Sequence, residues 1–260
     1  MKIFDQYAEY YNLFYENKHY SKEVAYLCQL IEEFRPGSRS LLELGCGSGK
    51  HAAYFADNGY DIFGVDQSPE MISQAQSLKN TLDPELHDRL AFEVADITKL
   101  EFGGSSGRTW DVALSLFHVV SYLTTNEKLL AMLNCVRDHL KPDGLFIFDC
   151  WYGPGVLTTL PESRQKHLEN DLISVVRTAE PIMEIDKNQV NVNYEIEITN
   201  KSDGEKQRIE EVHSMRYLFE PEIALMLELS GFKLCECHEW ESRKPAGLDS
   251  WYATFIAEKQ

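Results

Sequence analysis

Three closely spaced glycines limit most strongly what this chain can fold into. The apolar residues 40–44 lead directly into the sequence G-C-G-S-G from Gly45 to Gly49, and a helical stretch begins near Lys50. Glycine at alternate positions lets the backbone approach a ligand, because no Cβ stands in the way. In open α/β sheets such a loop lies at the carboxyl ends of the strands, where nucleotides bind. The loop therefore predicts a parallel sheet with a nucleotide-type cofactor at its edge.

Short apolar runs alternate with helical stretches through the first part of the chain. We expect strands at residues 40–44, 61–65, 90–94, 111–116 and 145–148, followed near the end of the chain by 232–240 and 251–257. Alternation of strand and helix is typical of a doubly wound sheet with helices on both faces. The expected fold is three-layer α/β, with a mostly parallel, seven-stranded Rossmann-like sheet.

Two segments have a different periodicity and predict additions to that sheet. Aromatic and apolar residues recur at helical spacing over residues 1–38, which predicts a helical N-terminal lid. Residues 190–198 alternate strictly between apolar and polar side chains, as half-buried antiparallel strands do. We therefore expect residues 151–218 to form an antiparallel β insertion after the fifth strand. Residues 1–150 and 219–260 would then form the main domain.

Charge and composition argue against several classes of protein. The chain has 25 Lys and Arg against 42 Asp and Glu, a net charge of −17, so it would repel the phosphates of a nucleic acid. No apolar run reaches the roughly 18 residues of a membrane span, and the N-terminus lacks the pattern of a secretory signal. We therefore expect a cytoplasmic protein with no nucleic-acid or membrane partner. We expect no metal either, because the candidate ligands Cys235 and Cys237 lie on one face of an expected strand.

The glycine spacing alone leaves the cofactor open. Gly47, Gly49 and Ala52 formally satisfy the dinucleotide pattern G-x-G-x-x-A, so an NAD-linked oxidoreductase is one alternative. Against it, the glycines begin two residues earlier, at Gly45, and the preceding strand contains an acidic residue, Glu43.

A wider set of motifs resembles the class I S-adenosylmethionine-dependent methyltransferases. The set comprises E-x-G-x-G-x-G from Glu43, G-V-D-Q-S-P-E-M over residues 64–71 and A-D-I over residues 95–97. The match spans most of the chain, and it implies S-adenosylmethionine as the cofactor. A non-catalytic module that only binds S-adenosylmethionine is a further alternative.

The expected cofactor contacts follow the strand ends. Asp66 ends the second strand at the same sheet edge as the glycines, where a carboxylate can accept hydrogen bonds from both ribose hydroxyls. The resemblance implies that Asp96 accepts from the adenine amino group, while the backbone of Ile97 contacts the ring. The other expected cofactor contacts are Tyr15, Tyr20, Glu43, Gly45, Cys46, Gly47, Gly49, Gln67, Met71, Leu116 and Phe117.

Residues 117–123 are similar to the bacterial small-molecule branch that includes nucleotide-sugar N-methyltransferases. In that branch an antiparallel insertion forms the platform for the acceptor, which implies an amine or hydroxyl of a small molecule such as a nucleotide-linked sugar. Those enzymes often have a histidine where this chain has Tyr122, whereas its own histidine is His118. Either side chain can serve as the catalytic base, since both follow the fourth strand at the ligand edge. Trp151 and Tyr152 are candidates for stacking on the acceptor.

Overall fold

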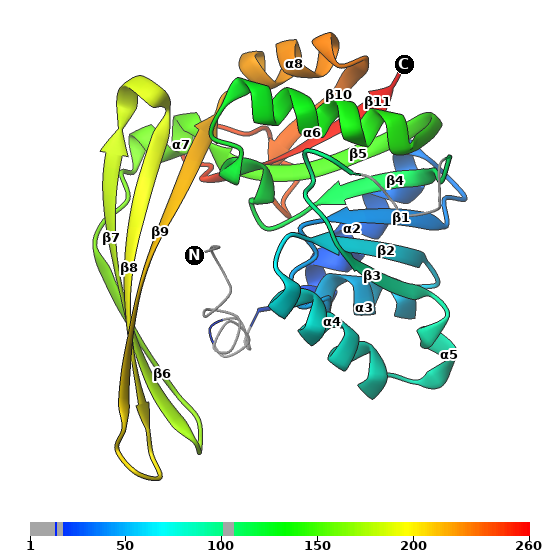
Figure 1. The fold of residues 1–260 in the computed structure, drawn as a ribbon. Helices are drawn as coiled ribbons and strands as arrows, with labels where there is room; N and C mark the ends of the chain where they lie inside the picture. Colours follow the sequence, from blue (N-terminus) through cyan, green and yellow to red (C-terminus); the bar gives the residue numbers. More distant parts are fainter. Residues whose placement is uncertain (1–13, 15–17, 101–106) are drawn as a thin grey trace.

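The computed structural model of the chain describes residues 14, 18–100 and 107–260. Its centre is a parallel sheet with the strand order β3-β2-β1-β4-β5 (Figure 1). These strands are β1 (Ser40–Leu44), β2 (Asp61–Asp66), β3 (Leu90–Val94), β4 (Trp110–Ser115) and β5 (Leu140–Tyr152). Next to β5 lies antiparallel β11 (Tyr252–Lys259), and β11 pairs in turn with antiparallel β10 (Phe232–Glu239). The predicted seven-stranded, mostly parallel Rossmann-like sheet is confirmed.

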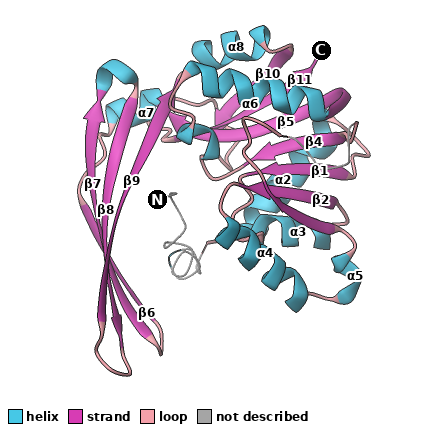
Figure 2. Cartoon of the chain, in the orientation of Figure 1, coloured by secondary structure: helices cyan, strands magenta, loops and turns pink. Residues whose placement is uncertain are grey.

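Helices cover both faces of this sheet and complete three layers (Figure 2). One face packs against α2 (Tyr20–Phe34) and α3 (Lys50–Asp57), and the other packs against α6 (Asn126–His139) and α8 (Glu220–Leu229). The remaining elements of this part are α4 (Pro69–Thr81), α5 (Pro84–His87) and the short 3₁₀ turn η1 (Val119–Tyr122). None of the helices in the described part of the chain is long and apolar enough to cross a membrane.

Side chains alternate between the two helical layers along each strand. In β1, Leu42 and Leu44 pack in the cluster that includes α6 and α8, whereas Leu41 packs in the cluster with α2 and α3. This is the two-residue period of a pleated strand. It decides which residues near the sheet edge face a ligand and which face a helix.

The insertion after β5 is an antiparallel sheet that stands apart from the helical layers (Figure 1). It comprises α7 (Gly153–Thr158), β6 (Arg164–Glu169), β7 (Ile173–Glu184), η2 (Ile185–Lys187), β8 (Gln189–Asn200) and β9 (Lys206–Leu218). The end of β9 pairs in parallel with the end of β5, at Trp151 and Tyr152. The predicted antiparallel insertion is confirmed, but β5 continues to Tyr152 and helix α7 precedes the first inserted strand. The predicted domain boundary at residues 150 and 151 thus falls inside β5, and the division into domains stays a prediction.

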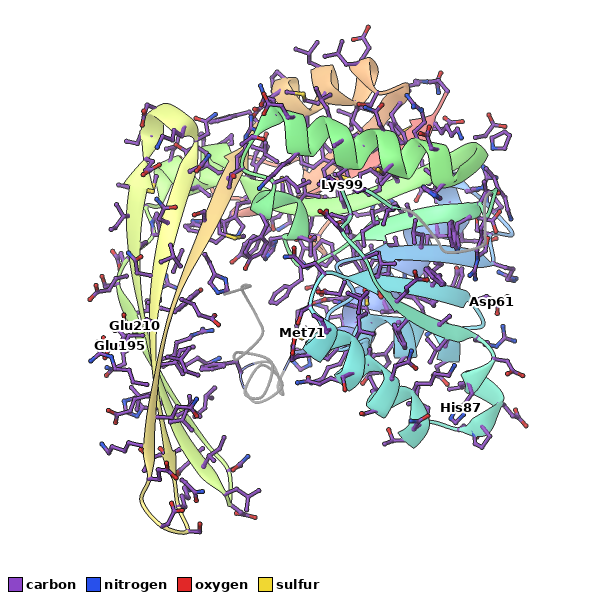
Figure 3. The ribbon with its side chains drawn as sticks, viewed as in Figure 1. Asp61, Met71, His87, Lys99, Glu195 and Glu210 are labelled. Carbon is purple, nitrogen blue, oxygen red and sulfur yellow. The ribbon has the colours of Figure 1, made fainter. Side chains whose placement is uncertain are left out.

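The inner face of the insertion is apolar, and its outer face is charged. Ile196 and Ile209 pack with Phe14 in a small buried cluster. Glu195 and Glu210, on β8 and β9 (Figure 3), are exposed and both bind Arg208. Of the predicted N-terminal lid, Phe14 and α2 belong to the described residues.

Candidate active site

A cavity of about 390 Å³ lies at the carboxyl ends of the parallel strands, a size typical of small-molecule sites. One part of its lining comes from the loops that follow β1, β2, β3 and β4. The other part comes from the inner face of the insertion, through Val192 and Tyr194 of β8 and His213 and Met215 of β9. The cavity therefore has a sheet-edge half and an insertion half.

The three glycines of the loop after β1 have different structural roles, although all have positive φ angles. A Cβ on Gly45 would lie 2.6 Å from Val119, and a Cβ on Gly49 would lie 2.9 Å from the ring of Phe92. A Cβ on Gly47 would meet no atom within 4 Å, and Gly47 lines the cavity. Gly45 and Gly49 are thus required by packing, whereas Gly47 leaves backbone open to a ligand.

Asp66, at the end of β2, connects the glycine loop to the cavity. Its Oδ2 accepts a hydrogen bond of 2.9 Å from the N–H of Gly47, and its Oδ1 accepts one of 2.9 Å from the N–H of Ser68. Burial raises the pKa of Asp66, against the effect of these N–H donors. Each carboxylate oxygen can accept more than one hydrogen bond. Asp66 can therefore fix the loop and bind a hydroxyl group at the same time.

The residues after β3 form the next part of the lining. Oδ1 of Asp96 accepts hydrogen bonds from the N–H and the hydroxyl of Thr98, at 2.9 and 2.7 Å. Burial opposes ionisation of Asp96, but the bonds from Thr98 outweigh it and lower the pKa of Asp96. Asp96 is thus a turn-forming aspartate that also lines the cavity, together with Ile97.

His118 is held in one orientation after β4. Phe117 and His118 both have positive φ, at 64° and 65°, which is uncommon for residues other than glycine. The backbone N–H of His118 donates to Asp149 at 3.1 Å, and Nδ1 of its ring contacts the same buried carboxylate. The ring stacks on Tyr252 with a centroid distance of 4.1 Å. With Nδ1 against Asp149, Nε2 is the ring nitrogen that can serve a ligand.

Tyr122 lies four residues further on and contacts the insertion. Its hydroxyl is 2.8 Å from Nδ1 of His213, and Nε2 of His213 is 3.0 Å from Oε2 of Glu211. The side chains of His213 and Glu211 are 5% and 9% exposed. Tyr122 and His213 both line the cavity.

Glu43 differs from its predicted role, because it does not line the cavity. It lies on the same side of β1 as Leu41, facing the layer of α2 and α3, and it is 2% exposed. Burial raises the pKa of Glu43 to about 8; Lys18 lowers this pKa and Asp66 raises it. The glutamate is therefore a buried neutral acid beneath the loop at neutral pH.

A buried ionic cluster lies next to Glu43. Nε2 of His51 is 2.6 Å from Oε2 of Glu23, and Nζ of Lys18 is 2.5 Å from the same oxygen. Burial lowers the pKa of His51, whereas the pKa of Glu23 is lowered by His51 and Lys18 despite its burial. The ammonium of Lys18 also lies 4.2 Å from the centre of the Phe117 ring. Of these residues, His51 lines the cavity.

The structure brings most of the predicted site residues together. Those that line the cavity are Tyr20, Gly45, Cys46, Gly47, Asp66, Gln67, Met71, Asp96, Ile97, Leu116, Phe117, His118, Tyr122 and Trp151. Met71 lies at the start of α4, near the sheet edge (Figure 3). Gly49 is buried beneath the loop and does not line the cavity. Tyr15 lies outside the described residues. The binding roles of all these residues stay predictions.

Tyr152 also differs from its predicted role. Trp151 lines the cavity, but Tyr152 is the next residue of the strand and packs in the cluster with α6 and α8. Two neighbouring strand residues point to opposite faces, so both could not contact one ligand.

Sequence reasoning missed several lining residues. They are Ser48, Lys50, His51, Val119, Val192, Tyr194, His213, Met215 and Tyr252. For Val192 and Tyr194 a signal was present, because the strict alternation of that strand already divides its two faces. His213 and Tyr252 had no comparable local signal.

The structure also bears on metal binding. No group of three or more His, Cys, Asp or Glu side chains is placed to hold a metal ion within residues 14, 18–100 and 107–260. The six cysteines are free thiols.

Comparisons with known proteins point in one direction. Residues 41–144 match the family model of a methyltransferase domain. A relative in Streptomyces venezuelae, a dTDP-3-amino-3,4,6-trideoxy-alpha-D-glucopyranose N,N-dimethyltransferase, is 30% identical over 149 residues, which are 56% of this chain and 58% of that protein. The match thus spans less than two thirds of this relative.

Two solved structures resemble the whole chain. A S-adenosylmethionine-dependent methyltransferase from Clostridium acetobutylicum superposes with a TM-score of 0.79, at 21% identity and 99% coverage of both chains. DesVI from Streptomyces venezuelae superposes with a TM-score of 0.78, at 22% identity and 98% coverage of both chains. At this level of identity the likeness shows the fold, insertion included.

Proposed function

We propose that this chain is an S-adenosylmethionine-dependent methyltransferase that methylates an amine of a small molecule, because residues 41–144 match a methyltransferase domain and the whole chain has the fold of such an enzyme. One observation supports this most directly. A single continuous cavity contains the open backbone of the glycine loop, the inner face of the insertion, and both His118 and Tyr122. Donor and acceptor can therefore meet in one place, which is what a direct transfer between them requires.

The residues of the sheet-edge half fit an adenosine-containing cofactor. The open side of Gly47 admits a ligand close to the backbone, and Asp66, which lines the same cavity, has a carboxylate that can accept from ribose hydroxyls. Asp96 and Ile97 then remain for the adenine ring. When bound, S-adenosylmethionine supplies an activated methyl group on a sulfonium centre. Aromatic rings suit such a cation, and Tyr20 and Phe117 line the same cavity, although the ammonium of Lys18 already lies over both rings.

The insertion half suits an acceptor of mixed polarity. Val192 and Met215 present apolar surface and His213 presents a hydrogen-bonding group, and the cavity adds Trp151 from β5 and Tyr122 from η1. The relative in Streptomyces venezuelae is named for a nucleotide-linked amino sugar, which has both kinds of surface. We therefore propose a nucleotide-linked amino sugar as the acceptor class.

Catalysis in this site depends on the alignment of the methyl donor with the acceptor amine. A base is needed only if the amine binds in its protonated form. We propose His118 as that base, because Asp149 holds Nδ1 and leaves Nε2 to take the proton. The stacking contact with Tyr252 keeps the ring from turning. Tyr122 is the second polar group beside the acceptor.

The test combines binding and transfer. Calorimetry should show binding of S-adenosylhomocysteine and no binding of NAD. Incubation with S-adenosylmethionine and dTDP-3-amino-3,4,6-trideoxy-α-D-glucopyranose should then add methyl groups to the sugar, as detected by mass spectrometry. NAD binding without S-adenosylhomocysteine binding would favour the oxidoreductase alternative, which the relatives described above do not support. Binding of S-adenosylhomocysteine with no transfer to any amino sugar would favour a non-catalytic module. The cytoplasmic location stays a prediction.

A further inference from the structure

A chain of three polar side chains connects the cavity with the inner face of the insertion. Tyr122 contacts Nδ1 of His213 at 2.8 Å, and Nε2 of His213 contacts Glu211 at 3.0 Å. The ring of Tyr194 meets the ring of His213 edge-on, with centroids 4.8 Å apart. His213 is thus held from three sides: by η1, by β8 and by its own strand, β9.

The direction of the hydrogen bonds in this chain follows from their chemistry. An ionised carboxylate can only accept, so Nε2 of His213 carries the proton that it donates to Glu211. In the neutral ring Nδ1 is then the acceptor, and the hydroxyl of Tyr122 must donate to it. The proton of Tyr122 consequently points at His213. The oxygen of Tyr122 can then act only as an acceptor towards other groups, and the Tyr122 side chain lines the cavity.

We propose that Glu211 and His213 are positioning residues that make Tyr122 a hydrogen-bond acceptor for the group to be methylated. The proposal rests on the proposed function and adds a requirement on the acceptor. The acceptor atom must bear an N–H or O–H that it can donate to Tyr122. A primary or secondary amine held in this way has its lone pair directed elsewhere and available for the methyl group.

The opposite direction of the hydrogen bond would inhibit transfer. If His213 carried its proton on Nδ1, it would donate to the oxygen of Tyr122, whose own proton would then be available to the acceptor. A phenol that donates to the amine lone pair occupies the electrons needed for attack. In the neutral ring Glu211 disfavours this tautomer, because a carboxylate offers no donor to Nε2.

The experiment compares two neighbouring glutamates of β9. Glu211→Gln keeps the size of the side chain but adds N–H donors, so His213 is no longer confined to one tautomer. Glu210→Gln is the matched control, because Glu210 lies on the opposite, exposed face of the strand and binds Arg208 (Figure 3). With the amino sugar as probe, Glu211→Gln should lower kcat about 3- to 10-fold, the effect of one hydrogen bond. Glu210→Gln should leave kcat unchanged, and both variants should bind S-adenosylhomocysteine as the parent does.

A double-mutant cycle separates positioning from a general loss of structure. Tyr122→Phe should lower kcat about 10-fold, since the same hydrogen bond is lost. Adding Glu211→Gln to Tyr122→Phe should then cause no further loss, because Glu211 acts only through Tyr122. Multiplicative losses in the double variant would overturn the proposal.

Nitrogen-15 NMR of the imidazole rings tests the same idea without turnover. The signal of His213, assigned by its absence from a His213→Gln variant, should show a neutral ring with the proton on Nε2. In Glu211→Gln the Nδ1-protonated form should gain population. A proton on Nδ1 in the parent protein, in either a neutral or a doubly protonated ring, would refute the positioning role of Glu211 and His213. If the parent binds S-adenosylhomocysteine but methylates no amino sugar, the proposed acceptor fails, while the NMR result still decides the tautomer.

Discussion

Replacing Glu43 by Gln should change how the stability of the protein depends on pH. Glu43 is fully buried beneath the glycine loop, and its Oε2 atom has no hydrogen-bond partner within the described residues. Burial raises the pKa of this carboxyl from 4.5 to about 8. The folded protein therefore keeps a proton at pH values where the unfolded chain has already released it.

The sign and size of the effect follow from this difference. Ionisation of Glu43 favours the unfolded chain, so the contribution of this group to stability is complete below pH 4.5 and is lost as the pH rises towards 8. The loss is about 1.36 kcal/mol per pH unit, and over this range it reaches at most about 5 kcal/mol. Glutamine cannot ionise, so Glu43→Gln removes the loss. Its amide adds buried N–H donors that cost about 1 to 3 kcal/mol at every pH.

Urea unfolding of both proteins at several pH values between 5 and 9 measures this difference. The free energy of unfolding of Glu43→Gln should be lower than that of the parent near pH 5 and should approach or exceed it near pH 9. Because Glu43 does not line the cavity, the Kd for S-adenosylhomocysteine at pH 7 should change less than about threefold, below the effect of one hydrogen bond. If the free energies of unfolding of the two proteins change with pH in the same way, Glu43 is not a neutral buried acid. A large rise in Kd would restore Glu43 as a cofactor contact.

Further substitutions test the cavity itself. Asp66→Ala should weaken binding of S-adenosylmethionine about 10- to 100-fold in calorimetry, whereas Asp61→Ala at the other end of β2 should have no effect; equal affinities would remove Asp66 from the site. His118→Asn, which tolerates positive φ, should lower kcat about 10²- to 10⁴-fold with S-adenosylhomocysteine affinity kept within a few-fold, and retained turnover would exclude this base. Gly45→Ala should destabilise the fold by about 2 to 4 kcal/mol in urea unfolding, because its Cβ meets a neighbour at 2.6 Å. Gly47→Ala should lower the free energy of unfolding by only about 1 to 2 kcal/mol, but it should weaken binding of the cofactor. Similar stabilities of the two variants would contradict the different roles of Gly45 in packing and Gly47 in ligand approach.

The sequence by itself determined the sheet and the sheet-edge half of the cavity. The glycine loop, Asp66 and Asp96 each directly follow a strand that the local pattern already indicated. Parallel strands end at the same edge of a sheet, so residues far apart in the chain meet there without any further information. This is why most of the predicted cofactor residues line one cavity.

The local sequence pattern did not show which face of a strand points towards the ligand. Glu43 belongs to the motif, and Tyr152 adjoins Trp151, yet both side chains point into the helical layers. A strand alternates, but an almost wholly apolar strand gives no sign of which of its faces meets the ligand. Only the packing of the helices on the two faces decides it.

The contacts that orient the candidate catalytic side chains were decided by tertiary structure alone. Tyr122 and His213 are 91 residues apart, and His118 meets the buried carboxylate of Asp149 from 31 residues away. Each of these side chains has an ordinary local environment in the sequence. The contact of Tyr122 with His213 exists only because β9 returns to the end of β5 and brings the inner face of the insertion against η1, whereas His118 reaches Asp149 because β4 and β5 are neighbours in the sheet. Contacts of this kind depend on the register of strands that are distant in the chain, which the pattern of neighbouring residues does not specify.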